Sequence, residues 1–302
     1  MTIYFAILHY KRSDVTSRCI SSILNLDPMN KHEVKVVIVD NASNNGSFER
    51  LRQEYKQHKN IVWISSDENL GFAKGNNLAF KYIQEADDAY LAVFLNNDTE
   101  IIQTDFIQSL CNYSESTNSD VLSIDVYDPY AKQHQSPLCL GENIMEYAFN
   151  ESKRADAVLN MGIVKKIYTS TKNLAVKYLF RFEWFRKILQ QRIQGMTKSA
   201  PEWEFDHNDV VPNGSCIIFS EHYIKNSAFA FYPKTNMYFE ECILKLICDK
   251  QGFKISYTPD LQIFHHHHEF DETSLDKYSL AKLRLKAQRE IDSYKEFISL
   301  CQ

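Results

Sequence analysis

The stretch that most constrains the fold is residues 89–100, AYLAVFLNNDTE. Its apolar run, YLAVFL, ends abruptly at Asn96, Asn97 and Asp98. A continuous apolar run bounded by polar turn residues is typical of a strand buried on both faces of a mainly parallel sheet. Such sheets bind ligands at their carboxyl edge, where a carboxylate can hold a divalent cation against phosphates. Taken alone, the segment could equally be a strand that ends in an Asx turn.

The sequence around this stretch alternates between strand and helix patterns, which predicts a doubly wound, mainly parallel sheet. In the first half of the chain, strands are expected at residues 3–8, 34–39, 61–65, 90–95 and 121–127, and helices at 15–24, 47–58 and 76–86. In the second half, strands are expected at 214–220, 253–257 and 261–264, and helices at 221–227, 237–249 and 274–300. Ser13 or Asp14 is the expected cap of the first helix, and Pro259 is expected to end a strand.

Two stretches break the alternating pattern. Residues 129–160 contain proline, glycine and mixed polar residues without a dominant period, so no element is assigned to them. Residues 165–198 carry nine lysines and arginines against one acid, Glu183, with apolar side chains between them at helical spacing. They could form an amphipathic helix on anionic lipid or on an anionic acceptor, or an ordinary helix that packs its apolar stripe on the core.

Composition narrows the class of protein. The chain has 302 residues, 44% of them hydrophobic, and a net charge of −5, which allows a substantial core and argues against a nucleic-acid binder. Its seven cysteines include no C-x-x-C motif, which is typical of reduced thiols in a cytosolic protein. The first expected strand lies too close to Met1 for a secretory signal, and no apolar run approaches the roughly 20 residues that span a bilayer. We therefore expect a cytoplasmic protein, soluble or peripheral to a membrane.

Three polar loops follow the early strands, at residues 9–12, 40–46 and 96–98. In a doubly wound sheet these loops converge at one edge. Asp40 could accept a hydrogen bond from a base or a ribose hydroxyl, or it could simply cap a turn. Lys74, in the glycine-containing stretch ENLGFAKGNN, could meet a phosphate, although a solvated lysine is the plainer expectation.

Two further clusters, one of glutamates and one of histidines, contain side chains that can transfer protons or bind a cation. Glu240 and Glu241 follow two aromatic residues, and a carboxylate beside apolar rings can have its pKa raised toward that of a general base. Adjacent acids at a helix start are also favourable with the helix dipole alone. Within the run of four histidines at 265–268, His265 and His267 point the same way in a strand and could share a cation. No third ligand lies nearby at zinc spacing.

Together and in this order, the motifs resemble family 2 of the glycosyltransferases, the inverting enzymes with the GT-A fold. The matching segments are ILHYKRSD, VVIVDNASNNGS, ENLGFAKGNN, VFLNNDTE, VPNGSCIIFS and MYFEECILKLICDKQGFKISYTPDLQIFHHH. They cover roughly residues 1–127 and 208–270, and their order is more specific than any single motif. The rhamnosyltransferase-like and capsular-polysaccharide branch of bacterial enzymes is the most similar.

The resemblance implies a role for each matched residue. For nucleotide-sugar binding it implies His9, Tyr10, Arg12, Asp40, Asn41, Asn69, Gly71, Lys74, Asn76, Asn97, Gly214 and Ser215. Asp98 stands where the family's Asp-x-Asp motif binds Mg²⁺ or Mn²⁺, and His265 matches a histidine that helps hold the metal or the pyrophosphate. The strand alternation adds His267 as a further candidate metal ligand. Glu241 matches the general base.

The chain departs from the family pattern in two places. Asn96 replaces the first acid of the metal motif, so Asp98 alone carries the charge. Where many members have Glu-Asp-x-Asp, this chain has Glu240-Glu241-Cys242-Ile243, which leaves open which glutamate is the base. The resemblance divides the chain into a GT-A domain at 1–270, with a variable, partly helical acceptor-side insertion at 128–207, and a helical extension at 271–302.

The expected function is inverting transfer of a hexosyl or rhamnosyl group from a uridine or thymidine diphosphate sugar to a hydroxyl of a glycan acceptor. The resemblance implies an acceptor on a lipid diphosphate carrier in bacterial surface polysaccharide synthesis, at the cytoplasmic face of the inner membrane. One alternative is a degenerate scaffold that only binds sugar nucleotides. A nucleotidyltransferase is less favoured, because the loop after the first strand, HYKRS, has no glycine. The terminal helix could pair with a copy of itself or pack on its own domain.

Overall fold

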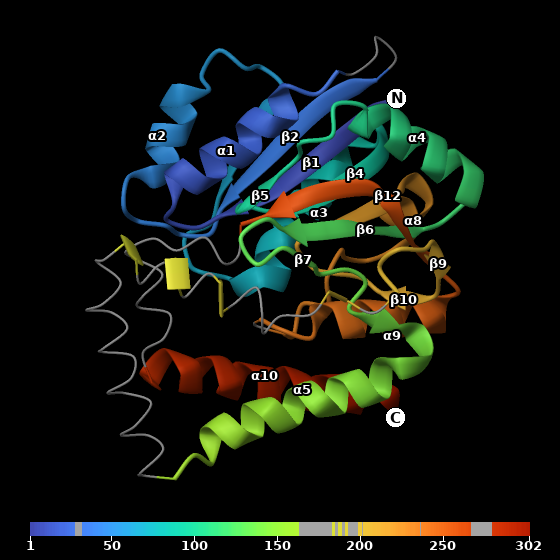
Figure 1. The fold of residues 1–302 in the computed structure, drawn as a ribbon. Helices are drawn as coiled ribbons and strands as arrows, with labels where there is room; N and C mark the ends of the chain where they lie inside the picture. Colours follow the sequence, from blue (N-terminus) through green and yellow to red (C-terminus); the bar gives the residue numbers. More distant parts are fainter. Residues whose placement is uncertain are drawn as a thin grey trace.

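One mixed β-sheet forms the centre of the molecule (Figure 1). The computed structural model describes residues 1–27, 32–162, 183–184, 187–188, 191–192, 199–200, 202–235, 237–266 and 280–302. Within these ranges the sheet has ten strands in the order β3-β2-β1-β4-β11-β6-β12-β5, with β7 paired to β6 and β9 paired to β12. A two-stranded sheet joins β8 and β10.

The strands of the large sheet are β1 (Thr2–His9), β2 (Glu33–Asp40), β3 (Ile61–Ser65), β4 (Ala89–Asn96), β5 (Thr99–Glu100), β6 (Val121–Asp128), β7 (Gln133–His134), β9 (His207–Asn208), β11 (Cys216–Ser220) and β12 (Ile255–His265). The small sheet consists of β8 (Cys139–Leu140) and β10 (Val210–Val211). The helices are α1 (Ser13–Leu24), α2 (Ser47–Glu54), α3 (Gly71–Ala86), α4 (Phe106–Thr117), α5 (Ile144–Leu159), α8 (Glu221–Asn226), α9 (Glu240–Gln251) and α10 (Leu280–Cys301), with a 3₁₀ turn, η1 (Gly141–Asn143), before α5.

The first half of the sheet is parallel, and its register brings the predicted polar loops together. β1 pairs with β2 and with β4, and β2 pairs with β3, all in parallel. His9 lies opposite Asp40, and Leu8 lies opposite Asn96, so these three strands end at the same level. The expected convergence of the loops at one edge is confirmed.

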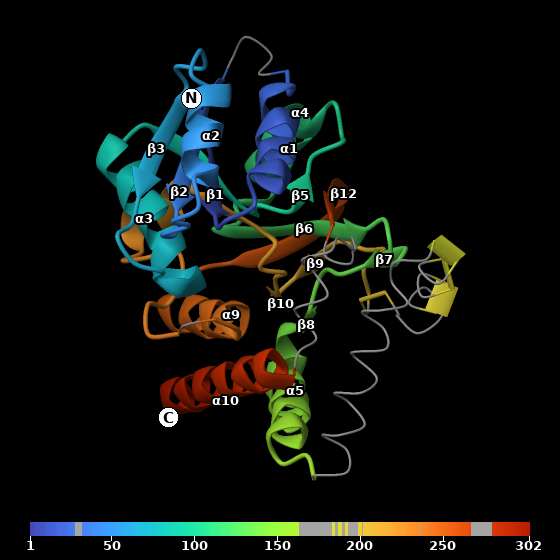
Figure 2. The ribbon, with the colours of Figure 1, turned by 90° about the vertical axis from the view of Figure 1, so that its left-hand side faces the viewer.

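These strands are largely apolar because helices cover both faces of the sheet (Figure 2). On β1, Ile3, Phe5 and Ile7 belong to one buried cluster, which also contains side chains of α1, α2 and α4. Tyr4 and Ala6 belong to a second cluster, with side chains of α3, α8 and α9. Alternate residues of one strand therefore point into two different cores.

The second half of the sheet is mixed. β11 runs antiparallel between β4 and β6, whereas β12 is parallel to β6. The predicted α/β fold with a mixed, mainly parallel sheet is confirmed, but the prediction that Pro259 ends a strand is wrong. β12 continues through Pro259 to His265, with a shift of register between Thr258 and Gln262. Proline cannot donate to the ladder, and such an irregularity accommodates it within a strand.

Several helix boundaries differ from the predictions. α1 is preceded by Arg12 without a side-chain cap, so neither Ser13 nor Asp14 acts as its N-cap, and α2 ends at Glu54 rather than near 58. α3 begins at Gly71 and not at Asn76. Its second glycine, Gly75, packs against β1, because a Cβ there would meet a Leu8 methyl carbon at 2.7 Å.

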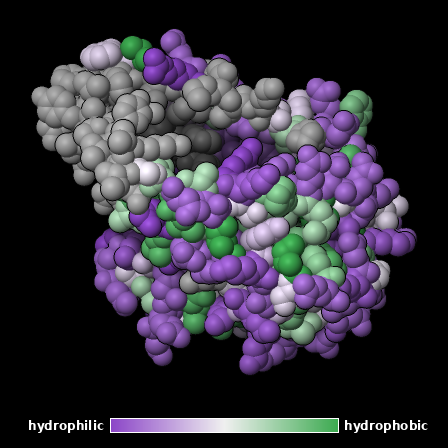
Figure 3. All heavy atoms as spheres, turned by 90° about the horizontal axis from the view of Figure 1, so that it is seen from below, coloured by the Kyte–Doolittle hydropathy of each residue, from purple (hydrophilic) through white to green (hydrophobic). Residues whose placement is uncertain are grey.

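The stretch that had no assigned element contains α5, which lies beside α10 on the side of α9 away from the sheet (Figures 1 and 2). Phe297 of α10 is fully buried in a third cluster with residues of α5 and α9, so the terminal helix packs on its own chain. Seen from below, hydrophobic and hydrophilic side chains are intermixed on this part of the surface (Figure 3). Within the described ranges no helix is long and apolar enough to cross a membrane.

Candidate active site

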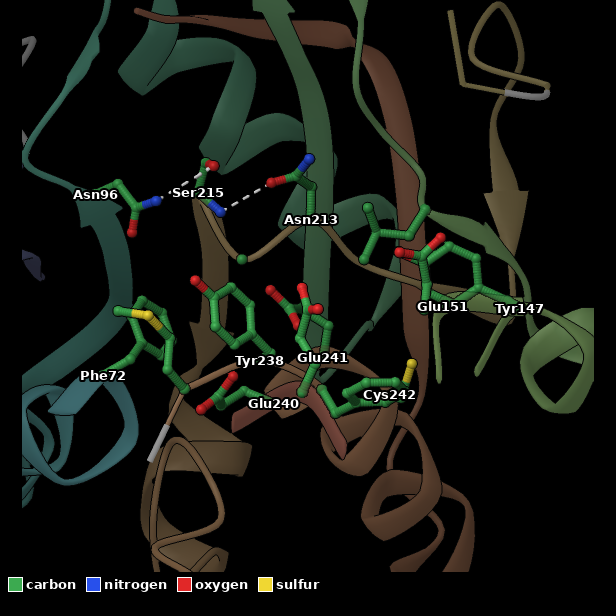
Figure 4. Close-up of a pocket in the computed structure, with 15 residues that line it drawn as sticks. Phe72, Asn96, Tyr147, Glu151, Asn213, Ser215, Tyr238, Glu240, Glu241 and Cys242 are labelled. Carbon is green, nitrogen blue, oxygen red and sulfur yellow. Dashed lines mark hydrogen bonds between the residues drawn. The ribbon is translucent and has the colours of Figure 1, made fainter. Parts of the chain in front are cut away.

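Two adjacent cavities open at the carboxyl edge of the sheet. The first, here called the sheet-edge cavity, has a volume of about 400 Å³ and is lined by Leu8, Tyr10, Asn41, Asn69, Gly71, Phe72, Asn96, Asn97, Asp98, Met237 and Arg289. The second, here called the glutamate cavity (Figure 4), has a volume of about 420 Å³ and is lined by Phe72, Asn96, Leu138, Tyr147, Glu151, Asn213, Gly214, Ser215, Met237, Tyr238, Phe239, Glu240, Glu241, Cys242 and Glu290. They share Phe72, Asn96 and Met237, so they meet at a common wall.

Asp98 lines the sheet-edge cavity, and the buried His265 lies directly behind it although 167 positions separate the two in sequence. Nε2 of His265 lies 3.3 Å from Oδ1 of Asp98, and the backbone N–H of His266 donates to the Asp98 carbonyl at 2.9 Å. The end of β12 therefore holds the turn that follows β4. On its other side, Nδ1 of His265 lies 2.8 Å from Oε1 of Gln135 and 3.2 Å from the Ser215 hydroxyl.

The Asp98 and His265 pair offers one carboxylate and one imidazole to a cation. Within the described ranges no three histidine, cysteine or acidic side chains gather to form a complete metal site. Mg²⁺ and Mn²⁺ commonly take one or two protein ligands and complete their shell with phosphate oxygens and water. The pair fits that mode of binding. The third predicted ligand, His267, lies outside the described residues.

Asn41 fixes the wall of the sheet-edge cavity that leads into α3. Its amide Nδ2 donates to Oδ1 of Asn69 at 3.2 Å and to the Gly71 carbonyl at 3.1 Å, and its Oδ1 accepts from the Leu70 N–H at 2.8 Å. Gly71 has a φ of +76°, which a residue without Cβ adopts without strain. One asparagine at the end of β2 thus positions the start of α3 beside the cavity.

Asp40 performs the plainer of its two predicted roles. Its carboxylate accepts hydrogen bonds from the N–H and hydroxyl of Ser43, and the Ser43 hydroxyl accepts from the Lys11 N–H at 2.8 Å. Asp40 is buried and lines neither cavity. In this structure its side chain holds two loops together, and its predicted contact with a nucleotide stays a prediction.

Four other residues predicted to bind the nucleotide sugar also lie outside both cavity walls. His9 is fully buried, with its ring nitrogens 2.7 Å from the Thr16 hydroxyl and 2.8 Å from the Ser47 hydroxyl, and burial lowers its pKa. Arg12 pairs with its neighbour Asp14 at 2.8 Å, Asn76 donates to a backbone carbonyl within α3, and Lys74 is exposed on α3. By contrast, Tyr10, Asn41, Asn69, Gly71, Asn97, Gly214 and Ser215 do line the cavities.

The glutamate pair begins α9 and faces the second cavity (Figure 4). The two residues before it, Tyr238 and Phe239, have φ values of +78° and +65°, a left-handed conformation that is costly for aromatic residues and concentrates at functional sites. The Glu241 carboxylate lies against Gly214, where a Cβ would overlap Oε1, and the Gly214 N–H donates to it. Only glycine leaves room for this contact.

The two carboxyl groups titrate as a coupled pair that holds a proton. Burial and the neighbouring Glu241 raise the pKa of Glu240 to about 8, so Glu240 is protonated at neutral pH. Burial also raises the pKa of Glu241, but its own backbone N–H and, to a lesser extent, that of Gly214 oppose the shift by stabilising the charged form. We therefore place the negative charge on Glu241 and the proton on Glu240.

Residues that the sequence did not single out complete the cavities. Arg289 of α10 lines the sheet-edge cavity, while its neighbour Glu290 lines the glutamate cavity together with Tyr147 and Glu151 of α5. Arg289 is the sole lysine or arginine among the described residues that line either cavity. No spacing signal marks these residues, because their helices reach the sheet edge only through tertiary packing.

The chain is similar in sequence to one protein family and in fold to several solved structures. The sequence profile described as "Glycosyl transferase family 2" matches residues 4–187. No curated protein matches the chain significantly. Among solved structures, Staphylococcus aureus TarS 1-349 in complex with UDP is similar with a TM-score of 0.53 and 13% identity, over 94% of this chain and 71% of that one. The mannosyltransferase PcManGT from Pyrobaculum calidifontis, in complex with GDP-Man and Mn²⁺, has a TM-score of 0.51 and 12% identity, over 98% and 74% of the chains. At such identities the likeness concerns the fold.

Proposed function

Because the chain belongs to glycosyl transferase family 2, as its sequence motifs predicted, we propose that it moves a sugar from a nucleotide diphosphate sugar to a hydroxyl of a glycan acceptor, with inversion. The observation that carries the proposal is the common wall of Phe72, Asn96 and Met237 between the two cavities. A donor in the sheet-edge cavity would present its sugar at this wall. An acceptor hydroxyl beside Glu241 would approach from the opposite side.

The donor side is suited to a diphosphate. Arg289 supplies a positive charge, and the amide groups of Asn41, Asn69 and Asn97 supply polar contacts. We propose a uridine or thymidine diphosphate sugar with a hexosyl or rhamnosyl group. Nucleotide binding is supported by the two structural neighbours, one in complex with UDP and the other with GDP-Man.

Asp98 and His265 would hold a Mg²⁺ or Mn²⁺ ion at the same cavity. When bound, the cation supplies neutralisation of the charge that builds on the departing diphosphate. The contacts of His265 with Gln135 and Ser215 orient its ring toward Asp98. The Mn²⁺ in the PcManGT complex supports a divalent cation in this fold.

Glu241 would act as the general base. Its carboxylate is held in the glutamate cavity by the Gly214 N–H, and the protonated Glu240 leaves the pair with one negative charge. Glu241 would accept the proton of the acceptor hydroxyl as the oxygen attacks the anomeric carbon. The bond to the diphosphate breaks on the opposite face, which inverts the configuration at that carbon.

We further propose that the acceptor belongs to bacterial surface polysaccharide synthesis, as in the capsular branch of the family, and is carried on a lipid diphosphate at the cytoplasmic face of the inner membrane. The basic residues between 165 and 198 lie largely outside the described residues, so membrane contact stays a prediction. Liposome flotation before and after neutralisation of those lysines and arginines tests it. Pairing of two chains through the terminal helix also stays a prediction.

Donor turnover tests the function directly. A panel of nucleotide sugars is first screened for thermal stabilisation of the protein with Mn²⁺, and release of nucleoside diphosphate is then measured with the best donor. Asp98→Ala and Glu241→Gln should each reduce turnover about 100-fold or more, while Glu146→Gln, an exposed acid of α5 outside both cavities, should not. Stabilisation without turnover in the wild type would instead favour a degenerate binding scaffold, which the missing acid at Asn96 makes the relevant rival.

A further inference from the structure

Two consecutive residues of α10 carry opposite charges into the two cavities. Arg289 lines the sheet-edge cavity and Glu290 lines the glutamate cavity. The sheet-edge cavity thus combines one cation, Arg289, with one carboxylate, Asp98, whereas the charged groups that line the glutamate cavity are all acids. This difference in charge between the two cavities limits the acceptors that the glutamate cavity can bind.

The glutamate cavity is lined by four carboxyl groups from three helices. Glu151 comes from α5, Glu240 and Glu241 come from α9, and Glu290 comes from α10. Among the described residues that line it there is no lysine, arginine or histidine. Two of the acids have cationic partners: Arg154 pairs with Glu151, and Lys286 lies 3.6 Å from Glu290. Arg289 lines the adjoining sheet-edge cavity.

Those outer cations weaken the field of the acids but do not cancel it. The side chains of Arg154 and Lys286 are 76% and 53% exposed, so water screens both pairs. The side chains of Glu151 and Glu290 are 32% and 19% exposed, and burial together with the charge of Glu151 raises the pKa of Glu290. In both ion pairs the acid is thus more buried than its cationic partner.

A second, independent feature indicates that the cavity binds a ligand. Glu240 is 2% exposed, and its Oε1 has no hydrogen-bond partner among the residues that the structure describes. Buried polar atoms are rarely left without a partner in folded proteins. A hydroxyl or an ammonium group of a ligand in the glutamate cavity would supply one.

Aromatic rings form much of the remaining wall. Phe72, Tyr147, Tyr238 and Phe239 line the cavity with the four acids (Figure 4). The face of an aromatic ring attracts a cation and gives no advantage to an anion. Lys286 already lies over the Tyr238 ring at 5.2 Å, which shows this preference at the edge of the site.

We propose that the glutamate cavity is an acceptor subsite that selects by charge. It takes a sugar residue with a protonated amine best, takes a neutral sugar next, and rejects a sugar whose own ring carries a carboxylate. Glu151 and Glu290 set this order, while Glu241 carries out the proton transfer. The inference rests on the proposed glycosyl transfer and specifies its acceptor class.

An acceptor panel that varies only in charge tests the inference. The probes are 4-nitrophenyl glycosides of glucose, glucosamine and glucuronic acid, with the corresponding galacto and manno sets, at a pH that keeps the amine protonated. Acceptor-dependent release of nucleoside diphosphate gives kcat/KM for each probe. In the wild type, within the best configuration, the amino and neutral sugars should exceed the uronic acid by about tenfold or more.

Variants then assign the selectivity to the two residues. The ratio of kcat/KM for the amino sugar to kcat/KM for the uronic acid should fall in Glu151→Gln, in Glu290→Gln and in the double variant. In the double variant we expect this ratio to fall about tenfold. Glu146→Gln on α5 and Asp292→Asn on α10 remove exposed acids of the same helices that do not line the cavity, and they should keep the wild-type order.

Three results would overturn the inference while the proposed function stands. They are a wild-type enzyme that uses the uronic acid as well as the neutral sugar, an unchanged order in the double variant, and donor hydrolysis that depends on Asp98 but responds to none of the nine probes. A wild-type protein that turns over no nucleotide sugar would instead remove the proposed function, and the inference with it.

Discussion

At the scale of single residues, the contact between Gly214 and Glu241 is the most sensitive point of the site. A methyl group at position 214 would overlap Oε1 of Glu241 and push the carboxylate away from the backbone N–H that holds it. Gly214→Ala should therefore lower donor turnover about 100-fold with little loss of stability. Turnover and thermal melting, measured on the same samples, check both parts.

Gly162→Ala is the matched control, because a Cβ at position 162 would meet no atom within 4 Å. It should leave turnover and melting temperature as in the wild type. Full activity in Gly214→Ala would show that the position of the Glu241 carboxylate is not critical for the reaction.

Glu240 makes the stability of the protein depend on pH. Its pKa is raised from 4.5 to about 8, so the folded state binds a proton more tightly than the unfolded state does. The resulting stabilisation is fully present below pH 4.5 and is lost as pH rises through 8. Because each unit of pKa corresponds to about 1.4 kcal/mol, the loss amounts to several kcal/mol.

Urea unfolding of the wild type and Glu240→Gln between pH 5 and pH 9 measures this effect. The wild type should lose several kcal/mol of unfolding free energy relative to the variant across that range. The difference between the two proteins reports on the Glu240 and Glu241 pair, since the remaining titrating groups are common to both. Parallel pH profiles would mean that Glu240 is not held protonated in the folded state.

Arg289 is expected to bind the donor rather than to take part in proton transfer, because it lines the sheet-edge cavity with Asp98. Arg289→Ala should raise KM for the nucleotide sugar about tenfold, and Arg289→Lys should recover part of that loss by keeping the charge. Steady-state kinetics with the donor varied separate KM from kcat. Arg284→Ala, at an exposed position of the same helix, is the control, and an equal KM in both alanine variants would contradict the assignment.

At the scale of elements, α10 depends on one aromatic anchor. Phe297 is fully buried, with its ring 6.4 Å from Phe239 and 6.5 Å from Tyr294. Phe297→Ala should lower the free energy of unfolding by about 3–5 kcal/mol, because it leaves a cavity between α10, α5 and α9. Phe149→Ala, on the exposed side of α5, should change it by about 0.5 kcal/mol or less in urea unfolding. Equal effects would contradict the packing of α10.

The sequence predicted the long, buried strands of this fold, but not the two-residue strands or the helices α4 and α5. A strand covered on both faces must be apolar throughout, so the run from Tyr90 to Leu95 was recognisable without any partner. α5 was missed because its buried side chains, Ala148, Ser152 and Ala155, are small or polar, so no large apolar residues mark its buried face. The start of α3 was missed because Gly75 suggested a turn, whereas it allows close packing on Leu8.

At the scale of the whole molecule, the part of the site that follows from strand order was predictable. Asp98 and His265 meet because β4 and β12 end at the same edge of the sheet. Asp40 and His9 also end strands, but they bond to neighbouring loops, since a polar residue in that place can serve either the ligand or the turn. The sequence could not place Arg289, Glu290 and Glu151 at the cavities. They lie on α10 and α5, and strand pairing does not fix the position of a helix relative to the sheet.

The most direct test of the central claim is an anomalous difference map from crystals of the wild-type protein grown with Mn²⁺ and a nucleoside diphosphate. We predict a manganese peak at coordination distance from the Asp98 carboxylate and from a diphosphate oxygen. In the same map Arg289 should face the diphosphate, and Glu241 should lie on the far side of the common wall. Manganese and nucleotide bound away from Asp98, or a diphosphate seated against the carboxylates of the glutamate cavity, would contradict it.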